Sequence, residues 1–115
     1  MIPNKPSILI YTNQAFEYIV EEVCAGIEEE GLIAEIHAKS DTDSVRLSKS
    51  AAKDSIVGSG IGIYRNMAAF SIKNLPPDKV VSQLKEPNSQ EARTMGGDSA
   101  RAVKRKPFRL KERTK

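Results

Sequence analysis

The chain opens with a short apolar run and then changes to a helical repeat. The run Ile8–Tyr11 lies within Ser7–Thr12, and unbroken apolar positions of this length are typical of a buried strand. Apolar residues then recur at steps of three and four positions: Phe16, Ile19, Val20, Val23, Cys24 and Ile27. This spacing predicts a helix with one apolar stripe, ended by Gly31. Leu32–His37 is predicted as a short strand, so the opening third is a βαβ unit with parallel strands and a right-handed crossover.

The middle of the chain predicts a second helix and a pair of strands. Asp41 or Asp43 can cap the helix. Ile56–Tyr64 is predicted as a glycine-rich third strand and Met67–Lys73 as a fourth. The Arg65–Asn66 link between them is too short to cross the sheet, so these two strands are expected to be antiparallel.

A break at Leu75–Pro77 precedes a fifth strand, which is predicted over Lys79–Leu84. With a final helix after it, the order of elements is βαβαββ(β)α. This order predicts an α/β domain of three layers, helices on both faces of a mixed sheet, with one reversed strand. The sequence contains no internal repeat and no low-complexity segment.

The final helix begins with a clear signal and contains a costly pair of residues. Asn88 and Glu91 have the spacing of a capping box, and Pro107 closes the element. Gly96 and Gly97 lie inside this helix, where each costs about 1 kcal/mol relative to alanine. They predict either a break in the helix or unusually close packing on the sheet.

Size and composition favour one soluble domain. The chain has 115 residues, and none of its apolar runs approaches the ~20 residues of a membrane span. Met1–Pro6 lacks the features of a signal peptide, so we expect a cytoplasmic protein with no membrane partner. Cys24 and His37 are each the single residue of their type, which excludes an internal disulfide and argues against a closed zinc site.

Charge divides the chain into an acidic part and a basic part. Residues 17–35 contain seven acids and no Lys or Arg, whereas residues 101–115 contain eight basic residues and one acid. We expect a single domain over residues 1–109 and a flexible basic tail over residues 110–115. Such a tail can serve nucleic acid, a phosphate-rich surface or an acidic protein. Phe108 is its only nearby aromatic residue, which disfavours stacking on single-stranded nucleic acid.

Several residues that carry chemistry elsewhere lack the necessary context here. Gly58, Gly60 and Gly62 lie within a predicted strand instead of at a strand-to-helix turn, so close helix packing explains them better than phosphate binding. Cys24 falls on the apolar stripe, where a thiol is inert, and His37 has no catalytic neighbour at a recognisable spacing. The sequence therefore predicts no self-sufficient active site.

The strongest candidate site is the acidic end of the first helix. Glu28, Glu29 and Glu30 crowd the last turn, where the partial negative charge of the helix end makes each acid unfavourable by roughly 0.3 to 1 kcal/mol. A bound cation or a basic partner would compensate. Mg²⁺ or Ca²⁺ suits carboxylate oxygens, but only one or two of these side chains can share a face, so a second protein would have to complete the site. A simply solvated acidic turn is the alternative.

Four segments together resemble a known family. Gly26–Gly31 resembles its helix end, Lys73–Pro76 its turn after an antiparallel strand, and Ala100–Lys104 with Pro107–Arg109 its last helix and exit. These matches run in order along nearly the whole chain. The family is the small subunit of the reactivating factor for coenzyme B12-dependent diol and glycerol dehydratases.

The resemblance implies a fold, a partner and a mechanism. It implies a three-layer α/β/α domain, similar to anticodon-binding domains, with a five-stranded mixed sheet whose fourth strand runs against the others. It implies a large ATPase subunit as partner, with ATP and cobalamin bound by partners and not by this chain. It matches Glu29 to a glutamate that contacts a metal ion between the subunits. The chain would be a non-catalytic placeholder in subunit exchange with the dehydratase.

Two other functions stay open at this point. A subunit of the dehydratase itself would share the fold, although those subunits usually carry an N-terminal extension and this chain begins near its first strand. A nucleic-acid-binding module would use the basic tail. The resemblance also leaves open whether the client is a diol or a glycerol dehydratase and whether the complex enters a bacterial microcompartment.

Overall fold

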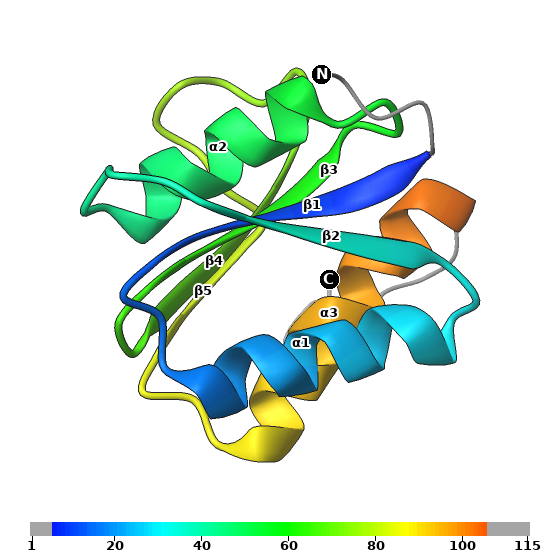
Figure 1. The fold of residues 1–115 in the computed structure, drawn as a ribbon. Coiled ribbons are helices and arrows are strands. Elements are labelled where there is room, and N and C mark those ends of the chain that lie inside the picture. Colours follow the sequence, from blue (N-terminus) through cyan, green and yellow to red (C-terminus); the bar gives the residue numbers. More distant parts are fainter. Residues whose placement is uncertain (1–5, 106–115) are drawn as a thin grey trace, which may run out of the picture.

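The computed structural model describes residues 6–105, which form five strands and three helices (Figure 1). In chain order they are β1 (Ser7–Asn13), α1 (Glu17–Glu29), β2 (Ile33–Ala38), α2 (Ser44–Asp54), β3 (Ser59–Tyr64), β4 (Met67–Ile72), β5 (Ser82–Lys85) and α3 (Ser89–Lys104). The predicted closure at Pro107 and the predicted tail over residues 110–115 lie outside the described residues.

The five strands form one mixed sheet in the order β2-β1-β3-β4-β5. β1 pairs in parallel with both β2 and β3, whereas β4 runs antiparallel to β3 and to β5. The short turn between β3 and β4 places Arg65 at a φ of 54° in the left-handed region. The predicted mixed sheet with a reversed fourth strand is confirmed.

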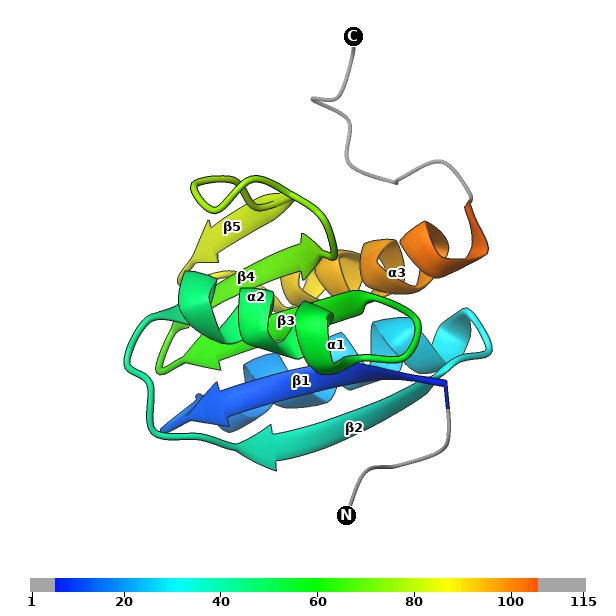
Figure 2. The same cartoon turned by 90° about the horizontal axis from the view of Figure 1, so that it is seen from above.

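Helices cover both faces of this sheet, with α1 and α3 on one side and α2 on the other (Figures 1 and 2). Successive β1 residues point to opposite faces, so Ile8 and Ile10 enter the core under α1 and α3, while Leu9 and Tyr11 pack with Leu47 of α2. The three-layer prediction is confirmed. Within residues 6–105, none of the helices is long and apolar enough to cross a membrane.

Glycines on β3 allow α2 to approach the sheet closely. A Cβ atom on Gly60 would lie 2.2 Å from the backbone nitrogen of Ala52, and one on Gly62 would lie 2.3 Å from the backbone oxygen of Ser44. Any side chain at either position would collide with the α2 backbone. Close helix packing, as predicted, accounts for Gly60 and Gly62. For Gly58 the prediction is wrong, since this residue lies in the turn before β3 at a φ of 77°.

The glycines of α3 serve a different contact from the one predicted. α3 is continuous, and a Cβ atom on Gly96 would lie 2.1 Å from the backbone oxygen of Val23 in α1. On α1, a Cβ atom on Gly26 would lie 2.1 Å from the backbone oxygen of Arg93. Gly96 therefore serves the close packing of α3 on α1, whereas the prediction placed this contact on the sheet. This crossing brings the acidic end of α1 beside α3.

Helix caps follow the sequence signals. Asp43, and not Asp41, caps α2 by accepting a hydrogen bond from the Val45 backbone nitrogen at 2.8 Å. Asn88 and Glu91 form the predicted capping box of α3, with bonds of 2.7 and 2.9 Å.

Two strands begin later than predicted because turns precede them. The Gly58 nitrogen donates to the Ser55 oxygen at 3.1 Å, so β3 starts at Ser59 instead of Ile56. The Lys79 nitrogen donates to the Pro76 oxygen at 3.0 Å, which removes Lys79 from β5.

Candidate functional site

The three glutamates of the candidate site stand where α1 ends. α1 ends at Glu29, Glu30 is the C-cap residue, and Gly31 follows at a φ of 82° in the left-handed region. The last turn of α1 contains no basic residue. The compensating charge must therefore come from another element or from outside the chain.

α3 supplies part of this compensation through Arg93. The Arg93 guanidinium lies between two α1 carboxylates, with Nε 2.9 Å from Glu22 Oε1 and Nη1 3.2 Å from Glu29 Oε2. The Glu29 side chain remains 49% exposed, so solvent and a partner can both reach it. The sequence predicted a bound cation or a basic partner, and part of the compensating charge is Arg93 of the same chain.

Glu30 is held more tightly to α3 than its neighbours are. Its Oε1 lies 3.1 Å from Lys104 Nζ, its Oε2 lies 3.5 Å from Arg101 Nε, and its side chain is only 13% exposed. The Lys104 ammonium also donates to the Glu30 backbone oxygen at 2.7 Å, which satisfies an end carbonyl of α1. Glu30 therefore fastens the end of α1 to α3.

Glu28 is exposed. It takes part in none of the ion pairs formed by residues 6–105. One turn earlier, Cys24 is half-buried, and burial together with the Glu28 carboxylate raises the pKa of its thiol. A raised pKa keeps the thiol protonated and inert, in agreement with the sequence analysis.

The glutamates do not make a metal site by themselves. In the described part of the chain, no group of three Asp, Glu, His or Cys side chains converges on one point. Glu29 and Glu30 turn toward different basic residues of α3. Glu28 and Glu29 stay exposed, so the end of α1 can offer one or two carboxylates to a cation whose other ligands come from elsewhere.

The crevice where open α/β sheets usually bind ligands is bridged here. In this strand order it lies at the carboxyl ends of β1 and β3. The Phe16 nitrogen donates to the Arg65 oxygen at 2.9 Å, and the Arg65 nitrogen donates to the Asn13 oxygen at 3.2 Å. These bonds tie the two loops together across the crevice.

Other side chains of chemical interest are engaged within the fold. Ser59 Oγ donates to the Ser99 oxygen at 2.9 Å in a buried position, so it is not a nucleophile. His37 is exposed, as predicted for a surface histidine, and its Nε2 lies 3.3 Å from Glu35 Oε1. The Tyr11 hydroxyl donates to Asp54, and burial together with that carboxylate raises the pKa of Tyr11.

Residues 5–109 match the family described as "Dehydratase medium subunit". The propanediol dehydratase-reactivating factor small subunit of Citrobacter freundii is 33% identical over 105 residues, which cover 90% of each chain. The diol dehydratase-reactivating factor small subunit of Klebsiella michiganensis is 32% identical over 105 residues, which cover 90% of this chain and 84% of that protein.

Solved structures agree with these relatives. A chain of the diol dehydratase-reactivating factor, solved in complex with ADP and Mg²⁺, superposes with a TM-score of 0.84 at 33% identity and covers 91% of this chain and 98% of its own length. A chain of a glycerol dehydratase reactivase gives a TM-score of 0.83 at 24% identity, which supports the fold alone. The chain therefore belongs to the dehydratase medium subunit family, among relatives that are small subunits of dehydratase-reactivating factors.

Proposed function

We propose that this chain is the non-catalytic small subunit of an ATP-dependent, chaperone-like factor that reactivates a coenzyme B12-dependent diol or glycerol dehydratase. The observation that carries the proposal is the match, along nine-tenths of the chain, to reactivating factor small subunits. The bridged crevice between β1 and β3 supports a binding role over an enzymatic one. ATP and cobalamin belong to the partners.

The mechanism we propose is subunit exchange. A fold shared with dehydratase medium subunits lets this chain and a dehydratase subunit compete for the same large subunit. When the large subunit releases this chain, it grips the dehydratase and loosens it until damaged cobalamin escapes. The chain acts as a placeholder, in the cytoplasm or in a bacterial microcompartment.

We propose that the end of α1 contacts the large subunit. Glu28 and Glu29 are exposed there, while Glu30 lies behind them against α3. Glu29 would supply one carboxylate to a shared Mg²⁺ or Ca²⁺, and the large subunit would supply the remaining ligands. Because Arg93 already contacts Glu29 at 3.2 Å, it competes with the cation for this carboxylate.

A reactivation assay tests the function. Dehydratase inactivated during turnover is mixed with ATP, Mg²⁺, fresh coenzyme and the large subunit, with or without this chain. We expect recovery of activity to require both subunits and ATP, and this chain alone to restore none. Full recovery with the large subunit alone would contradict the proposal.

A dehydratase subunit proper is the second candidate, since the family is named for that protein. Reconstitution of a dehydratase with this chain distinguishes the two functions. If the chain replaces the medium subunit of a dehydratase and yields an active enzyme, the second candidate is correct. Failure there, combined with reactivation in the previous assay, supports the first.

A further inference from the structure

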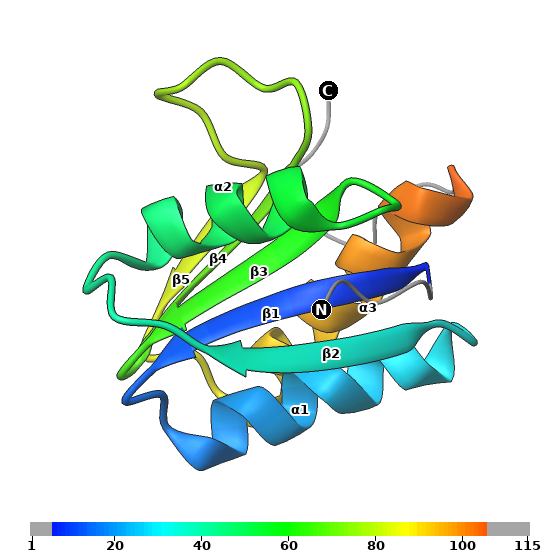
Figure 3. The same cartoon turned by 45° about the horizontal axis from the view of Figure 1, so that its top comes forward.

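A pocket on the α2 side of the sheet gathers three lysines and no acid. It lies between α2 and the connection from β4 to β5, which rises beside α2 in Figure 3. Its volume is about 380 Å³, within the range of small-molecule sites. Its polar lining consists of Lys49, Lys53, Lys73, Ser71 and Asn74, and we call it the three-lysine pocket.

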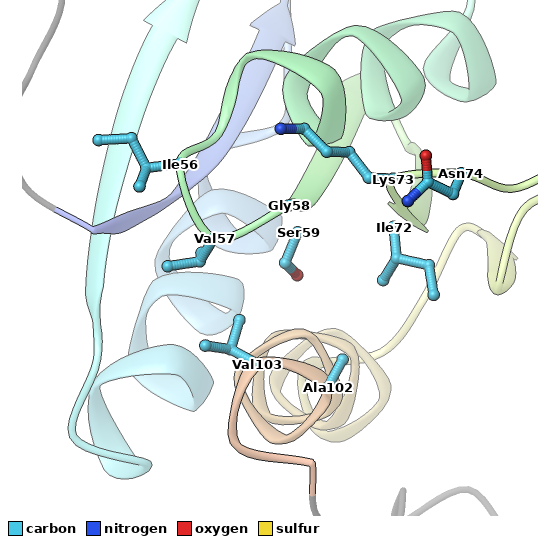
Figure 4. Close-up of a pocket in the computed structure, with 9 residues that line it drawn as sticks. All are labelled: Ile56, Val57, Gly58, Ser59, Ile72, Lys73, Asn74, Ala102 and Val103. Carbon is cyan, nitrogen blue, oxygen red and sulfur yellow. The ribbon is translucent and has the colours of Figure 1, made fainter.

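The lysines reach this pocket from two elements. Lys49 and Lys53 lie four residues apart and so share one face of α2, and Lys73 follows β4. The Lys73 stem runs over Gly58, with its Cβ 3.5 Å from the position that a Cβ on Gly58 would take. Figure 4, a close-up of the neighbouring pocket beside Gly58, shows the Lys73 side chain extended past Gly58 and away from Asn74.

Protein groups neutralise little of this charge. None of the ion pairs among residues 6–105 includes any of the three lysines. The Lys49 ammonium donates to the Pro76 oxygen at 3.0 Å, which is a neutral partner. The C-terminal end of α2 favours a cation nearby, but it carries only about half a negative charge against three positive ones. The pocket therefore keeps a net positive charge, which salt screens at the exposed Lys53 and Lys73.

We propose that the three-lysine pocket binds a phosphate group. Near neutral pH a phosphate carries up to two negative charges and several acceptor oxygens, which suits three ammonium groups and the exposed Asn74 amide. The lining contains no aromatic side chain on which a nucleobase would stack. The pocket therefore recognises the phosphate itself, either free or as a small ester. The proposal is independent of the large subunit.

The test measures phosphate binding to the purified full chain by calorimetry at low salt. The probes are inorganic phosphate and methyl phosphate, with acetate as a singly charged comparison. We expect saturable binding of both phosphates, weaker binding of acetate and loss of affinity as salt rises. Equal affinities assign the pocket to the phosphate alone, and tighter binding of the ester assigns it to an organic phosphate.

Matched variants locate the site. Lys53→Gln and Lys73→Gln should each weaken phosphate binding by about threefold or more, and Lys53→Arg should retain it. Lys85→Gln removes the same charge from exposed Lys85 on β5, outside the pocket, and should leave affinity unchanged. Absence of saturable binding, or an equal loss in Lys85→Gln, would overturn the proposal. In that case the lysines serve only the end of α2 and the neighbouring connection.

Discussion

Replacing Glu29 and Glu30 separately should reveal their different attachments to α3. Glu29→Gln loses an ion pair with Arg93 at 3.2 Å whose carboxylate side chain is 49% exposed. Such pairs contribute about 0.2 to 1 kcal/mol. The same change removes a charge that the helix end disfavours by about 0.3 to 1 kcal/mol. The two effects nearly cancel, so the free energy of unfolding should change by less than about 0.5 kcal/mol.

Glu30→Gln should cost more. The Glu30 side chain is 13% exposed and contacts Lys104 at 3.1 Å and Arg101 at 3.5 Å. Losing its charge leaves two partly buried cations without their counter-ion, at a cost of about 1 to 2 kcal/mol.

Urea unfolding of the full chain measures both variants, with Glu21→Gln, an exposed acid on the same helix, as the matched control. The m value should stay constant across the series. An equal loss for both variants, or a larger loss for Glu29→Gln, would refute the assignment of Glu30 as the structural residue and Glu29 as the accessible one.

Three further predictions concern packing, pH and nucleotide. Gly96→Ala should lower the free energy of unfolding, measured in urea, by about 1 to 3 kcal/mol, because the new Cβ would lie 2.1 Å from the Val23 oxygen. Gly31→Ala is the comparison: it meets no neighbouring atom, so any loss of stability there comes from the left-handed backbone alone. The free energy of unfolding should fall as pH rises above 10.0, the ordinary pKa of tyrosine, because Tyr11 ionises in the unfolded chain but stays protonated in the folded one. Tyr11→Phe should reduce this dependence of stability on pH by up to about 1.4 kcal/mol per pH unit. The isolated chain should neither hydrolyse ATP nor bind nucleotide tightly, and turnover that stays in constant proportion to this chain through successive purification steps would contradict this.

Much of the fold could be predicted because its signals are local. The step of three and four residues on α1 and the capping box at Asn88 each depend on a few neighbouring positions. The reversed fourth strand followed from a link too short to cross the sheet. The starts of β3 and β5 were misplaced because backbone turns, which leave a weak trace in sequence, precede both strands.

The candidate site could be found but not completed from the sequence. Three acids at a helix end are visible as a local conflict, yet Arg93 lies 64 positions from Glu29 and meets it only because α1 and α3 cross closely. The glycines at 26 and 96 were the available signal for that crossing. Their meaning depends on which helix faces them, and this is a property of the tertiary arrangement.

The most direct test of the central claim is calorimetry of this chain with the purified large subunit of a dehydratase-reactivating factor. We predict a saturable complex, weakened by Glu29→Gln most clearly when Mg²⁺ is present, unchanged by Glu21→Gln, and less sensitive to the mutation in EDTA. If wild type and Glu29→Gln bind with the same affinity under both conditions, the glutamates are a solvated surface with no role in the interface. The absence of any complex would contradict the role of this chain as the small subunit.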